Sequence, residues 1–144
     1  MGAWGYHHFE NDGAADFVIQ LQEEGITKIY EAILRVVELP ESEYVDLDDA
    51  QQALAAIEFV AAARGNASKD FPEESKRWMK EKYLADILEP DPDEAHKAYF
   101  NITEISQQAI ERIRSNSELK ELWEETENAD AWKQELDELK ERIT

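Results

Sequence analysis

Apolar side chains recur at spacings of three and four residues along most of this chain, which is the period of an α-helix. No segment alternates between apolar and polar residues at period two, so no β-strand is expected. The pattern predicts helices at residues 12–24, 26–38, 49–64, 73–88, 92–115, a short stretch after Ser117, and 129–143. We therefore predict an all-α fold, a helical bundle of about seven helices, in a single domain over residues 1–144.

The third predicted helix, residues 49–64, has the least polar surface of the seven. It holds seven alanines beside Leu54, Ile57, Phe59 and Val60, so it is apolar on nearly every side. A helix that is apolar all round is buried, and small side chains let its neighbours approach closely. We expect this helix at the centre of the bundle.

Residues that stop or cap helices separate these segments. An Asn or Asp side chain before a helix accepts hydrogen bonds from its free amides, and glycine or proline ends a helix. The expected caps and stops are, in order, Asn11 or Asp12, Gly25, Pro40, Asp48, Gly65 and Ser117.

The first eleven residues follow neither helical nor strand periodicity. Trp4, Tyr6 and Phe9 supply large apolar rings, while Gly2 and Gly5 allow tight backbone geometry. We expect residues 1–11 to form an ordered N-terminal arm, anchored by its rings on a helical body formed by residues 12–144.

Charge is the most unusual global property. The 144 residues carry 34 Asp and Glu against 15 Lys and Arg, a formal net charge of −19. Residues 1–63 hold thirteen of these acids and only Lys28 and Arg35 as bases. Without clustered bases, nucleic acid and anionic membrane are not expected as partners. A basic protein would be attracted, although an acidic surface also serves solubility alone.

The remaining composition narrows the chemistry. The chain has no cysteine, which excludes thiol catalysis and fits a reducing cytosol. There is no secretory signal and no apolar run long enough to cross a bilayer, so a cytoplasmic location is expected. No catalytic serine motif, nucleotide-binding loop or dinucleotide fingerprint occurs, and no cofactor is predicted.

The arm and the first helical turn contain residues that could form one metal site. His7, His8 and Asp12 supply two imidazoles and a carboxylate, the donor types of a catalytic zinc or non-haem iron site. Adjacent side chains of an extended arm point to opposite sides, however, and Asp12 is a candidate helix cap. Two histidines on the surface, or partly packed, are the simpler interpretation.

The stretches Met1-Gly-Ala-Trp-Gly5, Phe9-Glu-Asn-Asp12 and Asp16-Phe17 resemble the opening of a bacterial family known as domain of unknown function 4259. The Ala-rich helix, the segment from Ser117 to Glu125 and a final helix with Trp132 resemble its later parts, so the likeness covers essentially the whole chain. His7 and His8 depart from the small or apolar residues common there. The resemblance implies a bacterial cytosolic protein and no particular activity. It directs attention to Gly2, Trp4, Gly5, Phe9, Asn11, Asp12 and Asp16, whose residue types also suit anchoring and capping.

Two functions fit these features. The first is a non-enzymatic acidic module, of the inhibitor or immunity type, that binds a basic protein. The second is a metal-dependent enzyme or small-ligand protein with its site under the arm, using Trp4, His7, Asp12 and Asp16. No feature of the sequence indicates an oligomeric state.

Overall fold

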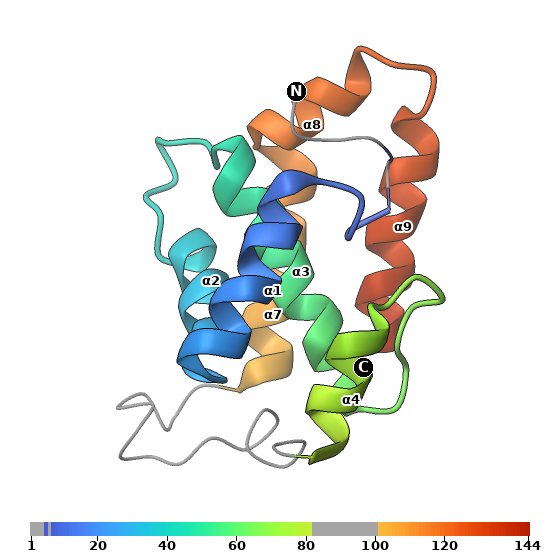
Figure 1. Cartoon of the computed structure of the whole chain (residues 1–144). Coiled ribbons are helices and arrows are strands. Elements are labelled where there is room, and N and C mark those ends of the chain that lie inside the picture. The colour runs from blue at the N-terminus through green and yellow to red at the C-terminus, as the bar shows by residue number, and fades with distance from the viewer. Residues whose placement is uncertain (1–4, 6, 82–100) are drawn as a thin grey trace.

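Helix α3 (Leu47–Ala63) runs through the middle of the molecule, with other helices on both sides of it (Figure 1). The computed structural model describes residue 5 and residues 7–81 and 101–144. Every residue of α3 from Ala50 to Ala61 is buried, as the apolar sequence predicts. The expectation that this helix is central is confirmed.

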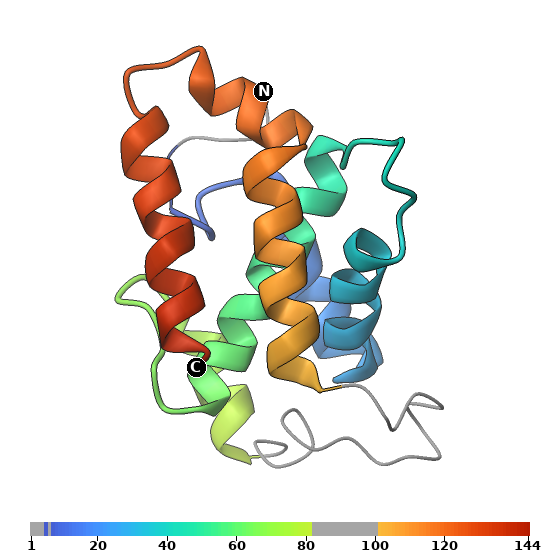
Figure 2. The ribbon, with the colours of Figure 1, turned by 180° about the vertical axis from the view of Figure 1, so that it is seen from behind.

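Two layers of helices enclose α3. Helix α1 (Asp12–Glu24) packs on the side seen in Figure 1, and α7 (Ile102–Ser115) lies on the side seen in Figure 2. Helix α2 (Thr27–Val37) contacts α1, α3 and α7. The described residues contain seven helices and no strand, so the predicted all-α fold is confirmed.

The last two helices and α4 complete the body. Helix α8 (Glu118–Glu124) crosses one end, and α9 (Ala129–Arg142) returns along α7 and α3. Helix α4 (Glu73–Glu81) lies near the C-terminus of the chain (Figure 1). One hydrophobic core joins α1, α2, α3, α7, α8 and α9, and its largest fully buried side chain is Trp132 of α9.

Most of the predicted caps are found, with one correction. Asn11 caps α1, Ser117 caps α8, and Gly25 and Gly65 follow α1 and α3 with φ angles of 94° and 88°. Helix α3 is capped by Asp46, not by Asp48 as predicted, because the Asp46 side chain accepts from the amide of Asp49 at 2.8 Å. Consecutive acids in this loop give several candidate caps, and the periodicity does not choose between them.

The prediction of one long helix over 92–115 is also corrected. Asn101 lies outside the helix, and its side chain accepts from the amides of Thr103 and Glu104 at 2.9 and 3.1 Å. These bonds cap α7, so the helix begins at Ile102. The predicted helical residues 82–88 and 92–100 lie outside the described part of the chain.

The loop between α2 and α3 is fastened to the corner between α7 and α8. The guanidinium of Arg112 donates to the carbonyls of Leu39, Pro40 and Glu43 at 2.9, 2.6 and 2.6 Å. A single parallel β-bridge joins Val45 to Ser117. The acidic loop is therefore held in place although most of its side chains face solvent.

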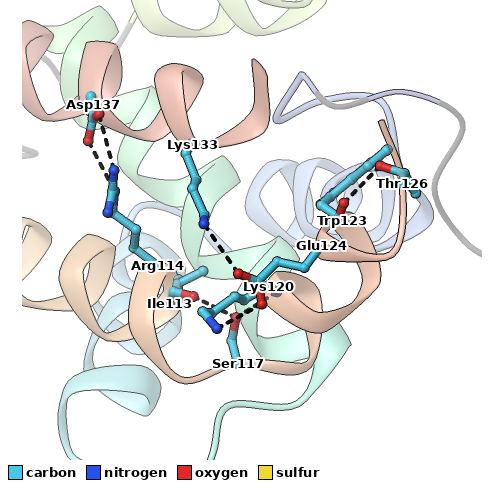
Figure 3. Close-up of polar contacts among 9 residues, drawn as sticks. All are labelled: Ile113, Arg114, Ser117, Lys120, Trp123, Glu124, Thr126, Lys133 and Asp137. Atoms are coloured by element: carbon cyan, nitrogen blue, oxygen red, sulfur yellow. Dashed lines mark hydrogen bonds and ion pairs between the residues drawn. The ribbon is translucent and has the colours of Figure 1, made fainter. Parts of the chain in front are cut away.

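The corner between α7, α8 and α9 is tied by side chains (Figure 3). The hydroxyl of Ser117 donates to the carbonyl of Ile113 at 2.6 Å and accepts from the amide of Lys120 at 3.0 Å. Glu124 forms ion pairs with Lys120 and Lys133, the second of which lies on α9. These contacts link α8 to the end of α7 and to α9.

Candidate functional site

Phe9 anchors the described part of the arm. Its ring meets Phe71 and Phe59 edge to face, with centroids 5.5 and 6.3 Å apart. Phe59 belongs to α3, so the arm is attached directly to the central helix. This agrees with the expected anchoring role of Phe9. The other expected arm residues, Gly2, Trp4 and Tyr6, lie outside the described residues.

Asn11 connects the arm to α1. Its side-chain oxygen accepts from the amide of Ala14 at 2.7 Å, and its side-chain nitrogen donates to the carbonyl of His8 at 3.1 Å. Asn11 is buried, whereas Asp12 and Asp16 are exposed on α1. Both the oxygen and the nitrogen of the Asn11 side chain are therefore used in local hydrogen bonds, which is an architectural role.

Replacing Asn11 with alanine is expected to lower the free energy of unfolding by about 2 kcal/mol, because a cap is lost and the carbonyl of His8 loses a donor. Urea unfolding followed by circular dichroism measures the change. Asn11→Asp keeps the cap acceptor but not the donor, so it should fall between alanine and wild type. A loss below about 0.5 kcal/mol for alanine would contradict the role given to this side chain.

The sequence did not predict that Gly13 lies in close contact with Gln51. A Cβ atom there would lie 2.6 Å from Oε1 and 2.7 Å from Cβ of Gln51, on α3. The amide of Gly13 also donates to Gln51 Oε1 at 3.3 Å. Glycine in the first turn thus lets α1 and α3 approach closely. A Cβ at Gly5 would meet the carboxylate of Glu10 at 2.5 Å, but this is the end of a flexible side chain that can move aside.

The two histidines of the arm have different surroundings. His7 Nδ1 lies 2.9 Å from the carboxylate of Glu135 on α9, and its Nε2 lies 3.9 Å from Glu10. Figure 1 shows this segment passing between α1 and α9. His8 is buried, and its Nε2 has no hydrogen-bond partner within the described part of the chain. The arm thus presents one histidine to α9 and inserts the other into the body.

The structure does not bring His7, His8 and Asp12 together as a ligand set. Within residues 5, 7–81 and 101–144, no three His, Asp or Glu side chains lie close enough to hold a metal ion. His8 is 3% exposed, whereas Asp12 faces solvent on the first turn of α1.

The other polar feature missed from the sequence is a buried ion pair. Both carboxylate oxygens of Glu58, on α3, accept from the guanidinium of Arg142 at the end of α9, at 2.7 and 2.8 Å. The side chain of Glu58 is 2% exposed. The side chains of Arg142 and Asn66 also donate to each other's backbone carbonyls, at 3.2 and 2.9 Å. This contact fixes the C-terminal end of α9 to the central helix.

Outside these contacts, the first half of the chain presents many carboxylates to solvent. Of the thirteen acids in residues 1–63, five form ion pairs: Glu10, Glu24, Glu31, Asp49 and Glu58. The other eight are exposed and have no ion pair in the described part of the chain: Asp12, Asp16, Glu23, Glu38, Glu41, Glu43, Asp46 and Asp48. The bases Lys28 and Arg35 are already paired. The negative charge of this half is therefore largely uncompensated.

Burial and a neighbouring acid affect the ionisation of Asp49. Burial raises the pKa of Asp49, the neighbouring carboxylate of Asp46 raises it further, and Arg35 opposes both. An acid with a raised pKa in the folded state destabilises that state wherever the acid is ionised. This destabilisation disappears as the pH falls through the raised pKa.

Asp49→Asn is expected to raise the free energy of unfolding at pH 7 by less than about 1 kcal/mol. The gain should shrink toward zero as the pH is lowered, because protonated Asp49 no longer carries the unfavourable charge. Urea unfolding across the acid range measures it, with Asp48→Asn as a matched control at the same helix end. A gain that grows toward low pH would contradict this interpretation.

A model of a known protein family matches most of the chain. The family described as "Domain of unknown function (DUF4259)" matches residues 2–135. The chain belongs to this family. The match includes residues 2–11 of the arm, the whole of α1 to α3 and the first half of α9. Comparisons with curated proteins and with solved structures found no match.

The geometry of this DUF4259 chain favours structural roles for the described arm residues. Phe9 packs on the core and Asn11 caps α1. Gly13, in the first turn of α1, allows close approach to α3. Among the described residues, no helix is long and apolar enough to cross a membrane. The exposed acidic surface is available for contact with another molecule, and among the described residues Ile19 and Tyr44 are large apolar side chains that stay exposed, at 55% and 48%.

Proposed function

We propose that this protein is a non-enzymatic, acidic protein-binding module of the bacterial cytoplasm, of the inhibitor or immunity type. It would cover a basic surface of its partner. The observation that carries this proposal is the set of eight exposed carboxylates in residues 1–63 that form no ion pair with any described residue. Their mutual repulsion is unfavourable in the free protein and would be relieved by a partner of opposite charge.

Electrostatic complementarity of this kind mainly accelerates association and selects the partner. A small acidic protein that blocks a basic active surface needs no catalytic group of its own. The rigid mounting of the α2–α3 loop by Arg112 supports this proposal, because preordered charges lose little entropy when a partner binds.

Affinity capture tests the proposal. The immobilised full chain is exposed to a bacterial lysate at low and at moderate salt, retained proteins are identified by mass spectrometry, and each is purified and rebound. We expect a basic protein that is retained strongly at low salt and more weakly at moderate salt, because salt screens exposed charges. Retention of nothing under either condition, or only of acidic proteins, would reject the proposal.

One observation keeps a second candidate. The buried nitrogens His8 Nε2 and Gln51 Nε2 have no hydrogen-bond partner among the described residues, and both residues adjoin the start of α1. Buried polar atoms are usually satisfied, so the two nitrogens would suit a small polar ligand under the arm, whereas only the imidazole nitrogen of His8 could bind a metal. Elemental analysis of the purified protein and a thermal-shift screen of metals test this candidate. If the protein contains no metal and no metal stabilises it, the metal-dependent version of this candidate is rejected.

A further inference from the structure

The outward face of α1 carries an apolar side chain within a line of carboxylates. Asp12, Asp16, Ile19 and Glu23 follow one another at intervals of four, three and four residues, and all four are exposed. At 3.6 residues per turn they fall within an arc of about 60° on the helix, along roughly 16 Å of its length. They form one straight face, which we call the α1 face.

The α1 face has no partner in the described structure. Ala14, Phe17 and Leu21 take the opposite side of α1 into the core. Ile19 remains 55% exposed, and none of the three acids is in an ion pair. Figure 1 shows α1 on the outside of the molecule, with α3 behind it. The face is thus available along most of the helix.

The helix that carries this face is held firmly. The Asn11 cap fixes its first turn, Gly13 brings it against Gln51, and Phe17 meets Phe59 with centroids 6.0 Å apart. The spacing of the acids around Ile19 is therefore set before any partner arrives. A fixed pattern of charge and apolar surface can be matched by another helix, which reads positions at i, i+3, i+4 and i+7.

We propose that the α1 face is the docking surface for a cationic amphipathic helix of a partner protein. One apolar side chain of that helix would cover Ile19, and Lys or Arg residues beside it would meet Asp16 and Glu23. This arrangement matches the usual anatomy of an interface, an apolar centre within a charged rim. A second copy of this chain is disfavoured as the occupant, because its net charge of −19 would repel the first. The inference rests on the proposed function and specifies its surface.

The test uses the full chain labelled with ¹⁵N and a synthetic amphipathic helical peptide of leucine and lysine. A second peptide with glutamine in place of lysine controls for charge. We expect the cationic peptide to shift backbone amide signals centred on residues 12–23, and the glutamine peptide to leave them unchanged. Shifts centred on residues 38–46 or on α8 and α9, or no shifts at all, would overturn the docking surface.

Variants at the exposed apolar side chains test the contact separately. Ile19→Ala should weaken binding of the cationic peptide about tenfold, because most of an apolar side chain is no longer buried at the interface. Tyr44→Ala, the matched control on the α2–α3 loop, should leave the affinity within about twofold. Equal affinity of Ile19→Ala and wild type would overturn the inference. Because Ile19 is largely exposed, its variant should keep the melting temperature of the wild type.

The peptide and the lysate experiments fail in different ways. If a basic partner is captured from the lysate and still bound by Ile19→Ala, the proposed function stands and the α1 face is wrong. If no basic partner is captured, the proposed function itself fails, whatever the peptide shows.

Discussion

Replacing Glu58 with alanine is expected to lower the free energy of unfolding by about 3–5 kcal/mol. The guanidinium of Arg142, whose side chain is 22% exposed, would lose both oxygens of the buried carboxylate, at 2.7 and 2.8 Å. Burial opposes the charge on Arg142, but the hydrogen bonds and charge of Glu58 outweigh it, so the pKa of Arg142 is raised. Urea unfolding at neutral pH measures the loss.

A double variant distinguishes the effect of the Glu58–Arg142 ion pair from the effect of the packing of the two side chains. Glu58→Met combined with Arg142→Met removes both charges and keeps apolar volume, so it should recover most of the stability lost by Glu58→Ala. The cost of the single variant would then come from the uncompensated charge. A loss below about 1 kcal/mol for Glu58→Ala would show that water or another group satisfies Arg142, against the role described.

Phe59→Ala is expected to cost about 3–5 kcal/mol, and to loosen the arm as well. Phe59 is fully buried, and its ring meets those of Phe9, Phe17, Phe71 and Trp78 edge to face, with centroids 4.9 to 6.3 Å apart. Losing this ring leaves a cavity at the point where α1, α3, α4 and the arm meet. Urea unfolding measures the global loss, and hydrogen exchange of residues 7–11 measures the effect on the arm.

Phe59→Leu is the matched control for this cavity. It keeps most of the apolar volume, so it should cost less than about 1.5 kcal/mol and leave arm exchange close to that of wild type. If Phe59→Ala lowered stability but left exchange of residues 7–11 unchanged, the arm would not depend on packing against the side chain at position 59.

The helices were predictable because each buries one face at a 3.6-residue period, which leaves its mark on the sequence. Residues 49–64 predicted the central helix from composition alone, and Gly25 and Gly65 marked helix ends because they adopt positive φ. Apolar periodicity and helix-ending glycines lie within a few residues of the helix or helix end that they determine.

Contacts between distant residues left no such mark. Glu58 and Arg142 are 84 residues apart, and nothing in the order of residues pairs these two among 34 acids and 15 bases. The approach of Gly13 to Gln51, 38 residues away, depends on how α1 crosses α3. The same limit applies to the arm, where residue types indicated anchoring and capping but could not show His7 beside Glu135.

The central claim is that the acidic surface meets the partner, while the described arm residues maintain the fold. The most direct test is quantitative capture of the same lysate partner by wild type, by a variant carrying Asp16→Asn, Glu23→Gln and Glu41→Gln, and by Phe9→Leu. We expect the charge-neutralised chain to lose retention at low salt and Phe9→Leu to keep it. Full retention by the neutralised chain, or loss with Phe9→Leu while the fold remains intact, would contradict the claim.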